Sequence, residues 1–154
     1  MSIMKKFGLI AILLVAVLLV SGCGNKNVEG KLEDLMAKIY ENIPEDEKPM
    51  MLTNTEVTEE NVEYFLGTAD IEYEEALASE PAVSSIAHSV VLVRVKDGAD
   101  IEAIKTTIKE KVNPRKWYCV EAEEVVVKNK GNLVILIMTS STGLDALEKG
   151  FDNL

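Results

Sequence analysis

His88 is the only histidine of the chain and the first candidate for acid–base chemistry. Its imidazole could act as a general base or bind a metal ion near neutral pH. No second histidine or cysteine lies at metal-ligand spacing, and no serine or cysteine stands in a recognisable nucleophile elbow. We therefore predict a structural or merely exposed histidine within a strand, and no metal site. The alternative is a small cell-envelope hydrolase that pairs His88 with an acidic side chain.

Cys23 carries the strongest chemical signal, because it ends an export signal in three parts. Lys5-Lys6 precede an unbroken apolar run of 14 residues, Phe7–Val20, which Ser21-Gly22 follow. As a helix this run would span about 21 Å, short of the hydrocarbon core of about 30 Å. Its length is therefore typical of a signal peptide rather than of a permanent membrane span.

The residues Val20-Ser21-Gly22-Cys23 resemble the lipobox of bacterial lipoproteins. The resemblance implies a diacylglycerol thioether on Cys23 and cleavage between Gly22 and Cys23. Two acyl chains hold a protein stably at a membrane, so we expect a lipid-anchored protein on the extracytoplasmic side of the cell membrane. The alternatives are an ordinary secretory signal with a chance cysteine and an uncleaved anchor helix. Residues 1–22 are thus the predicted signal peptide, and residues 23–30 a flexible tether.

Cys119 is left alone once Cys23 is lipidated. A single remaining thiol cannot form an internal disulfide, and the absence of a Cys-x-x-Cys pair disfavours dithiol redox chemistry. Cys119 lies in the aromatic-rich run Trp117-Tyr118-Cys119-Val120, for which we predict extended backbone and a small buried thiol.

Two cations and the only tryptophan come together in Arg115-Lys116-Trp117, directly after a predicted helix stop. Such a cluster could hold an anionic group or stack on a flat ligand. The structural alternative is that Trp117 fills core space while the cations pair with nearby acids. Arg115, Lys116, Trp117 and His88 are therefore the candidate contacts for a ligand or a partner.

The charge of the chain is strongly negative. Its formal net charge is −10, and removal of residues 1–22, which hold two lysines and no acid, brings it near −12. This charge excludes nucleic-acid binding through a general basic surface. The acidic run Asp70–Glu75 lacks the register of a calcium loop, so the acids are predicted to form a solvated face.

Hydrophobic periodicity, caps and turn residues place these side chains on a small set of elements. Asp100 is a predicted helix N-cap, Thr58 another, and Gly67 a helix C-terminal glycine, while Thr142 with Asp145 resembles a capping box. The predicted helices cover residues 31–41, 58–66, 101–112 and the segment from Thr142 to the end. The predicted strands cover residues 70–78, 86–96, 125–127 and 133–138, the last two as a hairpin around Gly131.

This order of elements predicts one α+β domain over residues 31–154. We expect an antiparallel sheet of about four strands, with residues 86–96 in its middle and the helices packed on one face. The β-α-β-β-α core is similar to ferredoxin-like layouts.

Three segments, Ala87–Ile101, Arg115–Glu123 and Gly131–Met138, together resemble small lipoproteins of Gram-positive Firmicutes that carry a domain of unknown function, the family numbered 4358. The resemblance covers about residues 31–154. It implies an extracytoplasmic lipoprotein with no established activity, cofactor or catalytic residue.

The sequence therefore favours a membrane-anchored binding or protein-interaction module over the small hydrolase. Its partner would be an envelope protein or a small ligand, and no cofactor is expected. A regulatory protein that contacts an envelope enzyme or transporter is a third hypothesis. This one predicts an exposed apolar patch of several hundred Å².

Overall fold

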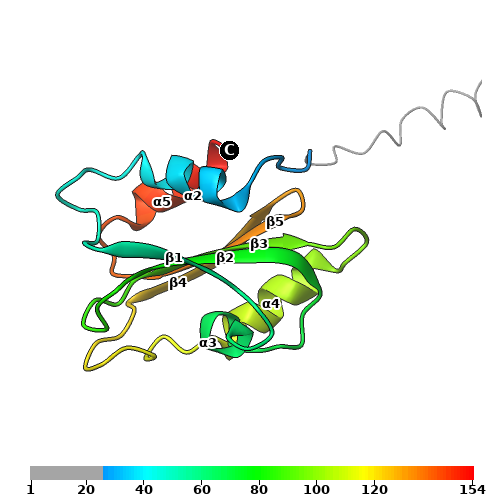
Figure 1. The fold of residues 1–154 in the computed structure, drawn as a ribbon. Helices are drawn as coiled ribbons and strands as arrows, with labels where there is room; N and C mark the ends of the chain where they lie inside the picture. The colour runs from blue at the N-terminus through cyan, green and yellow to red at the C-terminus, as the bar shows by residue number, and fades with distance from the viewer. Residues whose placement is uncertain (1–25) are drawn as a thin grey trace, which may run out of the picture.

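The computed structural model describes residues 26–154 as a five-stranded antiparallel sheet between two pairs of helices (Figure 1). The predicted α+β fold is confirmed, and the strand order is β1-β2-β3-β5-β4. The sheet has one strand more than the four expected. The helices are α2 (Leu32–Tyr40), α3 (Val62–Leu66), α4 (Ile101–Lys111) and α5 (Leu144–Asp152), and the strands are β1 (Leu52–Glu56), β2 (Tyr73–Pro81), β3 (Ser89–Val95), β4 (Glu124–Lys130) and β5 (Leu133–Thr139).

The prediction that all helices pack on one face is wrong, because the sheet is covered on both. Figure 1 shows α2 and α5 above the sheet and α3 and α4 below it. Successive residues of β3 point alternately to the two layers: Val90 and Leu92 pack with α2 and α5, whereas Val91 and Val93 pack with α3 and α4. A strand covered on both faces needs a continuous apolar sequence. The predicted central position of β3 is confirmed.

In each helix layer, a glycine allows the backbones of two neighbouring helices to come close together. In the upper layer, α5 passes so near α2 that a Cβ atom on Gly150 would lie 2.5 Å from the carbonyl oxygen of Ile39. In the lower layer, Gly67 ends α3 with φ +76° directly against the backbone of Lys111, the last residue of α4. The predicted caps at Asp100 and Gly67 are confirmed, and the Asp100 side chain accepts a hydrogen bond from Ala103 N at 3.0 Å.

Several local predictions are wrong. The sequence does not predict β1, because four of its five residues are exposed and it therefore shows no apolar alternation. The helix expected from Thr58 begins only at Val62, since Asn61 occupies the N-cap position. Thr142 does not cap α5, whose N-cap residue is Gly143. The run 116–120 is irregular rather than extended, with φ +59° at Cys119.

The strand directions divide the sheet into two ends. The chain enters at what we call the proximal end, where Val28 N donates to Asn132 Oδ1 in the β4–β5 turn and Arg94 donates to the carbonyl oxygens of Val28 and Gly30 at 2.5 and 2.6 Å. The opposite, distal end carries the segments 41–51, 82–88, 112–123 and 140–143 that connect the elements there.

Part of the predicted flexible tether belongs to the domain. Val28 is buried in the upper core, and residues 26–30 follow the proximal end of the sheet. The tether prediction is therefore wrong for residues 26–30. The predicted signal peptide 1–22, the cleavage site Gly22–Cys23 and the lipid attachment at Cys23 lie outside the described residues.

Candidate functional site

Trp117 and Lys116 point into the molecule rather than toward a ligand. Trp117 is buried in the lower core. The Lys116 ammonium lies 2.5 Å from Glu80 Oε1, and it stands 4.3 Å from the centroid of the Tyr64 ring. The rings of Phe65 and Trp117 complete an aromatic surround. Burial of the Lys116 ammonium lowers the pKa of Lys116, although the carboxylate of Glu80 opposes this shift.

Arg115 lies on the surface and forms an ion pair with Glu121. The three side chains of the Arg115-Lys116-Trp117 cluster thus have internal partners that match the structural alternative. They do not converge on a common space, so the geometry gives no support to a ligand site at this cluster.

His88 precedes β3 and is buried within a chain of hydroxyl groups. Its Nε2 lies 2.7 Å from Tyr40 Oη and its Nδ1 lies 3.0 Å from Thr139 Oγ1. Burial lowers the pKa of His88 from 6.5 to about 4, and burial also raises the pKa of Tyr40. The imidazole is therefore neutral at pH 7. A protonated Tyr40 donates to Nε2, which leaves Nδ1–H to donate to Thr139.

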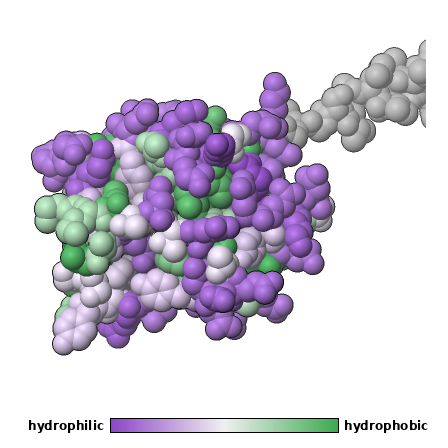
Figure 2. Space-filling view, viewed as in Figure 1, coloured by the Kyte–Doolittle hydropathy of each residue, from purple (hydrophilic) through white to green (hydrophobic). Residues whose placement is uncertain are grey.

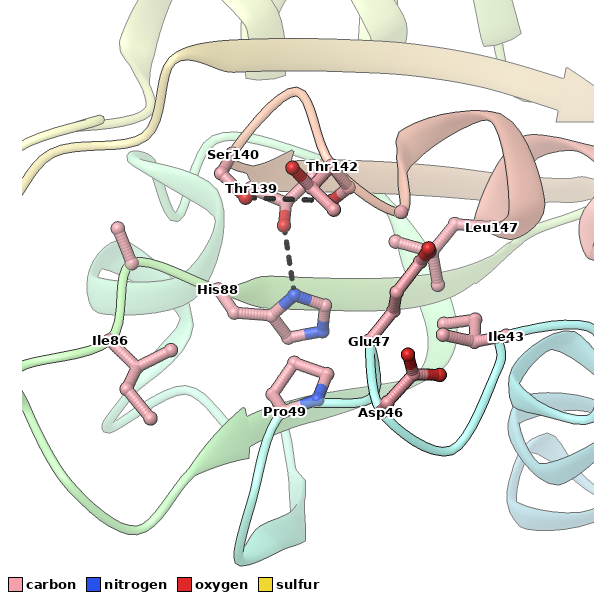
Figure 3. Close-up of a pocket in the computed structure, with 12 residues that line it drawn as sticks. Ile43, Asp46, Glu47, Pro49, Ile86, His88, Thr139, Ser140, Thr142 and Leu147 are labelled. Atoms are coloured by element: carbon pink, nitrogen blue, oxygen red, sulfur yellow. Dashed lines mark hydrogen bonds between the residues drawn. The ribbon is translucent and has the colours of Figure 1, made fainter.

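His88 and Thr139 of this network line a cavity of about 270 Å³ at the distal end. Figure 3 shows His88 between the loop that carries Asp46 and Glu47 and the segment from Thr139 to Thr142. Neither carboxylate hydrogen-bonds to His88, whose two ring nitrogens are already engaged. A general base needs a free nitrogen within hydrogen-bond reach of its substrate. The cavity therefore lacks the histidine–carboxylate pair that the hydrolase alternative requires.

An apolar surface that the sequence did not reveal lies beside this cavity. Met50, Met51, Val83 and Tyr118 are 73%, 65%, 37% and 76% exposed, and we call these four side chains the distal patch. They come from three different segments that hydrogen bonds hold together: Ala82 N donates to Met51 O, and Tyr118 N donates to Ser84 O. Figure 2 shows part of the hydrophobic surface of this face at the distal end of the molecule.

Two residues with unusual backbone conformation lie in the distal patch or next to it. Within residues 26–154, Met51 and Cys119 are the only non-glycine residues with positive φ, at 58° and 59°. Such conformations destabilise the folded chain by about 1 kcal/mol each and are concentrated at functional sites. Cys119 is exposed, so the prediction of a buried thiol is wrong. The turn that places Tyr118 on the surface exposes Cys119 as well.

No group of three or more histidine, cysteine or acidic side chains within residues 26–154 could hold a metal ion. None of the helices in this part of the chain is both long and apolar enough to cross a membrane.

Comparison with known proteins adds no relative to these observations. Neither a scan against protein-family models nor searches of curated proteins and of solved structures find a match to the chain.

Proposed function

We propose that the chain is a membrane-anchored extracytoplasmic lipoprotein, similar to those of the family numbered 4358, that acts as a protein-interaction module. The observation that carries the proposal is the distal patch. Four of the five large apolar side chains exposed on residues 26–154 belong to it. Exposed apolar side chains that cluster, rather than scatter singly, are typical of protein-binding surfaces.

The position of the patch fits a protein held at its N-terminal end. Cys23 is three residue steps from Lys26, where the described chain begins, and three extended steps span at most about 11 Å. Diacylglycerol on Cys23 would therefore keep the proximal end near the membrane surface. The distal patch, at the other end of the strands, would face away from the lipid and toward other envelope proteins.

The hydrolase alternative has weaker support. It needs His88 to exchange protons with a substrate, yet both ring nitrogens are bonded to hydroxyl groups and burial lowers the pKa of His88 to about 4.

The anchor is tested by growth of cells with radiolabelled palmitate. We expect label in the parent chain, and neither label nor membrane retention after Cys23→Ala. A Cys23→Ala chain that stays fully with the membrane would favour an uncleaved anchor helix.

The interaction is tested by native electrophoresis of membranes dissolved in a mild detergent. We expect the parent chain to migrate in a larger complex, and the variant Met50→Ser/Val83→Ser/Tyr118→Ser to migrate alone. Because these side chains are exposed, the triple variant should remain folded. The control variant Asp34→Ser/Lys38→Ser/Glu110→Ser changes three exposed side chains on α2 and α4 and should keep the complex. Equal migration of both variants would refute the patch as the contact surface.

A further inference from the structure

Strand β1 is an open edge of the sheet, and its free backbone groups can be assigned by residue. In an antiparallel ladder, residues that exchange hydrogen bonds with the partner strand alternate with residues whose N–H and C=O point away. The ladder with β2 is bounded by a bond from Ala82 N to Met51 O and one from Val57 N to Ala76 O, and the register is unbroken between them. Thr53 and Thr55 therefore face β2, whereas Leu52, Asn54 and Glu56 face outward.

Most of these outward groups are unsatisfied within residues 26–154. Asn61 Nδ2 donates to the carbonyl of Glu56 at 3.0 Å. The N–H groups of Leu52, Asn54 and Glu56 and the carbonyls of Leu52 and Asn54 have no partner in this part of the chain. Residues 53–56 are exposed, so solvent reaches the edge. Five free main-chain groups in a row can bind an added strand.

Strand β4, at the opposite edge of the sheet, is protected against pairing with another strand, whereas β1 is not. On β4, Lys128 pairs with Glu148 and Asp152 of α5, and Lys130 donates to the carbonyl of Asp152 at 2.7 Å. Lysines on an edge strand are a common device against unwanted strand pairing. Leu52–Glu56 contains neither lysine nor proline.

We infer that the β1 edge binds an extended, basic segment of the protein partner as a sixth strand. The inference rests on the proposed function and names the chemistry of the partner. Residues 52–60 carry Glu56, Glu59 and Glu60 and no cation, and all three glutamates are exposed without an ion pair among residues 26–154. A lysine or arginine on the added strand would lie against them.

Charge also argues against a second copy of this chain as the occupant. Two domains of net charge near −12 would bring like charges together along this edge. At the other end, β1 begins directly after Met51 of the distal patch. The segment should therefore carry apolar side chains where it meets the patch and basic ones near Glu56. Its paired part would be about five residues, or about 17 Å, long.

The inference is tested with a displayed library of random ten-residue peptides, selected on the full chain in detergent micelles. We expect enriched peptides with net positive charge and alternating apolar side chains. Asn54→Pro removes one outward N–H and leaves the bonds to β2 intact, so peptide affinity should fall at least tenfold. Asn54→Ala keeps the backbone and should change affinity less than twofold. Thr55→Pro, which removes an inward N–H, should instead destabilise β1 itself.

A second variant keeps the inference testable if Asn54→Pro does not fold. Glu56→Lys changes only an exposed side chain and should also weaken the selected peptides about tenfold. Failure to enrich any peptide, or equal binding by the parent, Asn54→Pro and Glu56→Lys chains, would overturn the inference. So would a dimer in sedimentation that Asn54→Pro converts to a monomer, because the occupant would then be a second copy. The serine variants of the distal patch test the proposed function separately, since they leave the β1 backbone unchanged.

Discussion

Glu80→Gln and Lys116→Met should each lower the free energy of unfolding by about 3 kcal/mol. Each variant removes one charge of a pair whose side chains are only 15% and 4% exposed. Loss of one partner of a buried ion pair typically destabilises a protein by about 3 to 5 kcal/mol, because the other charge stays in a poorly solvating site. Urea unfolding followed by circular dichroism measures the effect.

The double variant Glu80→Gln/Lys116→Met separates charge from packing. It leaves no uncompensated charge, so it should recover at least half of the summed loss of the two single variants. The exposed pair Arg115–Glu121 supplies the control, since water screens this pair and Glu121→Gln should leave the free energy of unfolding almost unchanged. If Glu80→Gln and Lys116→Met lower the free energy of unfolding no more than Glu121→Gln does, the buried pair behaves like a surface pair.

The second large effect is a loss of stability in acid that depends on His88. In the folded chain the pKa of His88 is lowered from 6.5 to about 4, so below pH 6.5 the unfolded state binds a proton that the folded state does not. This contribution to stability is complete above pH 6.5 and is lost as the pH falls toward 4. A shift of this size corresponds to about 3 kcal/mol.

Urea unfolding between pH 7.5 and pH 4 measures this loss. Carboxyl groups also titrate toward the acid end, so the parent must be compared with His88→Gln, which cannot gain the proton. The parent should lose about 3 kcal/mol more than the variant between pH 6.5 and pH 4. If both chains have the same dependence on pH, His88 is not buried in its neutral form.

The parts of the fold that the sequence predicts are those with strong local patterns. Asp100, Gly67 and Gly131 mark a helix start, a helix end and a hairpin turn, and the structure confirms all three. The continuous apolar runs of β3 and β5 indicate strands buried on both faces. A strand that is apolar on both faces needs a cover on each of them, so this pattern indicates two helix layers rather than the one that was predicted.

The candidate site could not be predicted, because its partners are far apart in the chain. His88 contacts Tyr40 and Thr139, which are 48 and 51 positions away. Lys116 is buried only because the fold brings Glu80 and Tyr64 to it. In the sequence it is one of two cations beside a tryptophan, a pattern that a surface site and a core site share.

Edge strands and surface patches leave even weaker signals. β1 is exposed on both faces, so its sequence Leu-Thr-Asn-Thr-Glu has no apolar alternation. The distal patch joins side chains from three segments that are distant in sequence. The Met50-Met51 pair offers no more than two apolar residues after a proline, which is ordinary in a loop.

The central claim, that the distal end is the contact surface of a membrane-held protein, is tested most directly by photo-crosslinking in intact cells. A benzophenone amino acid replaces Tyr118 in the distal patch or, in the matched control, Glu33 near the proximal end of α2. We predict a discrete crosslinked protein product from position 118, absent from position 33 and lost when Met50→Ser and Val83→Ser are added. Products of equal yield from both positions, or no product from position 118, would contradict the account.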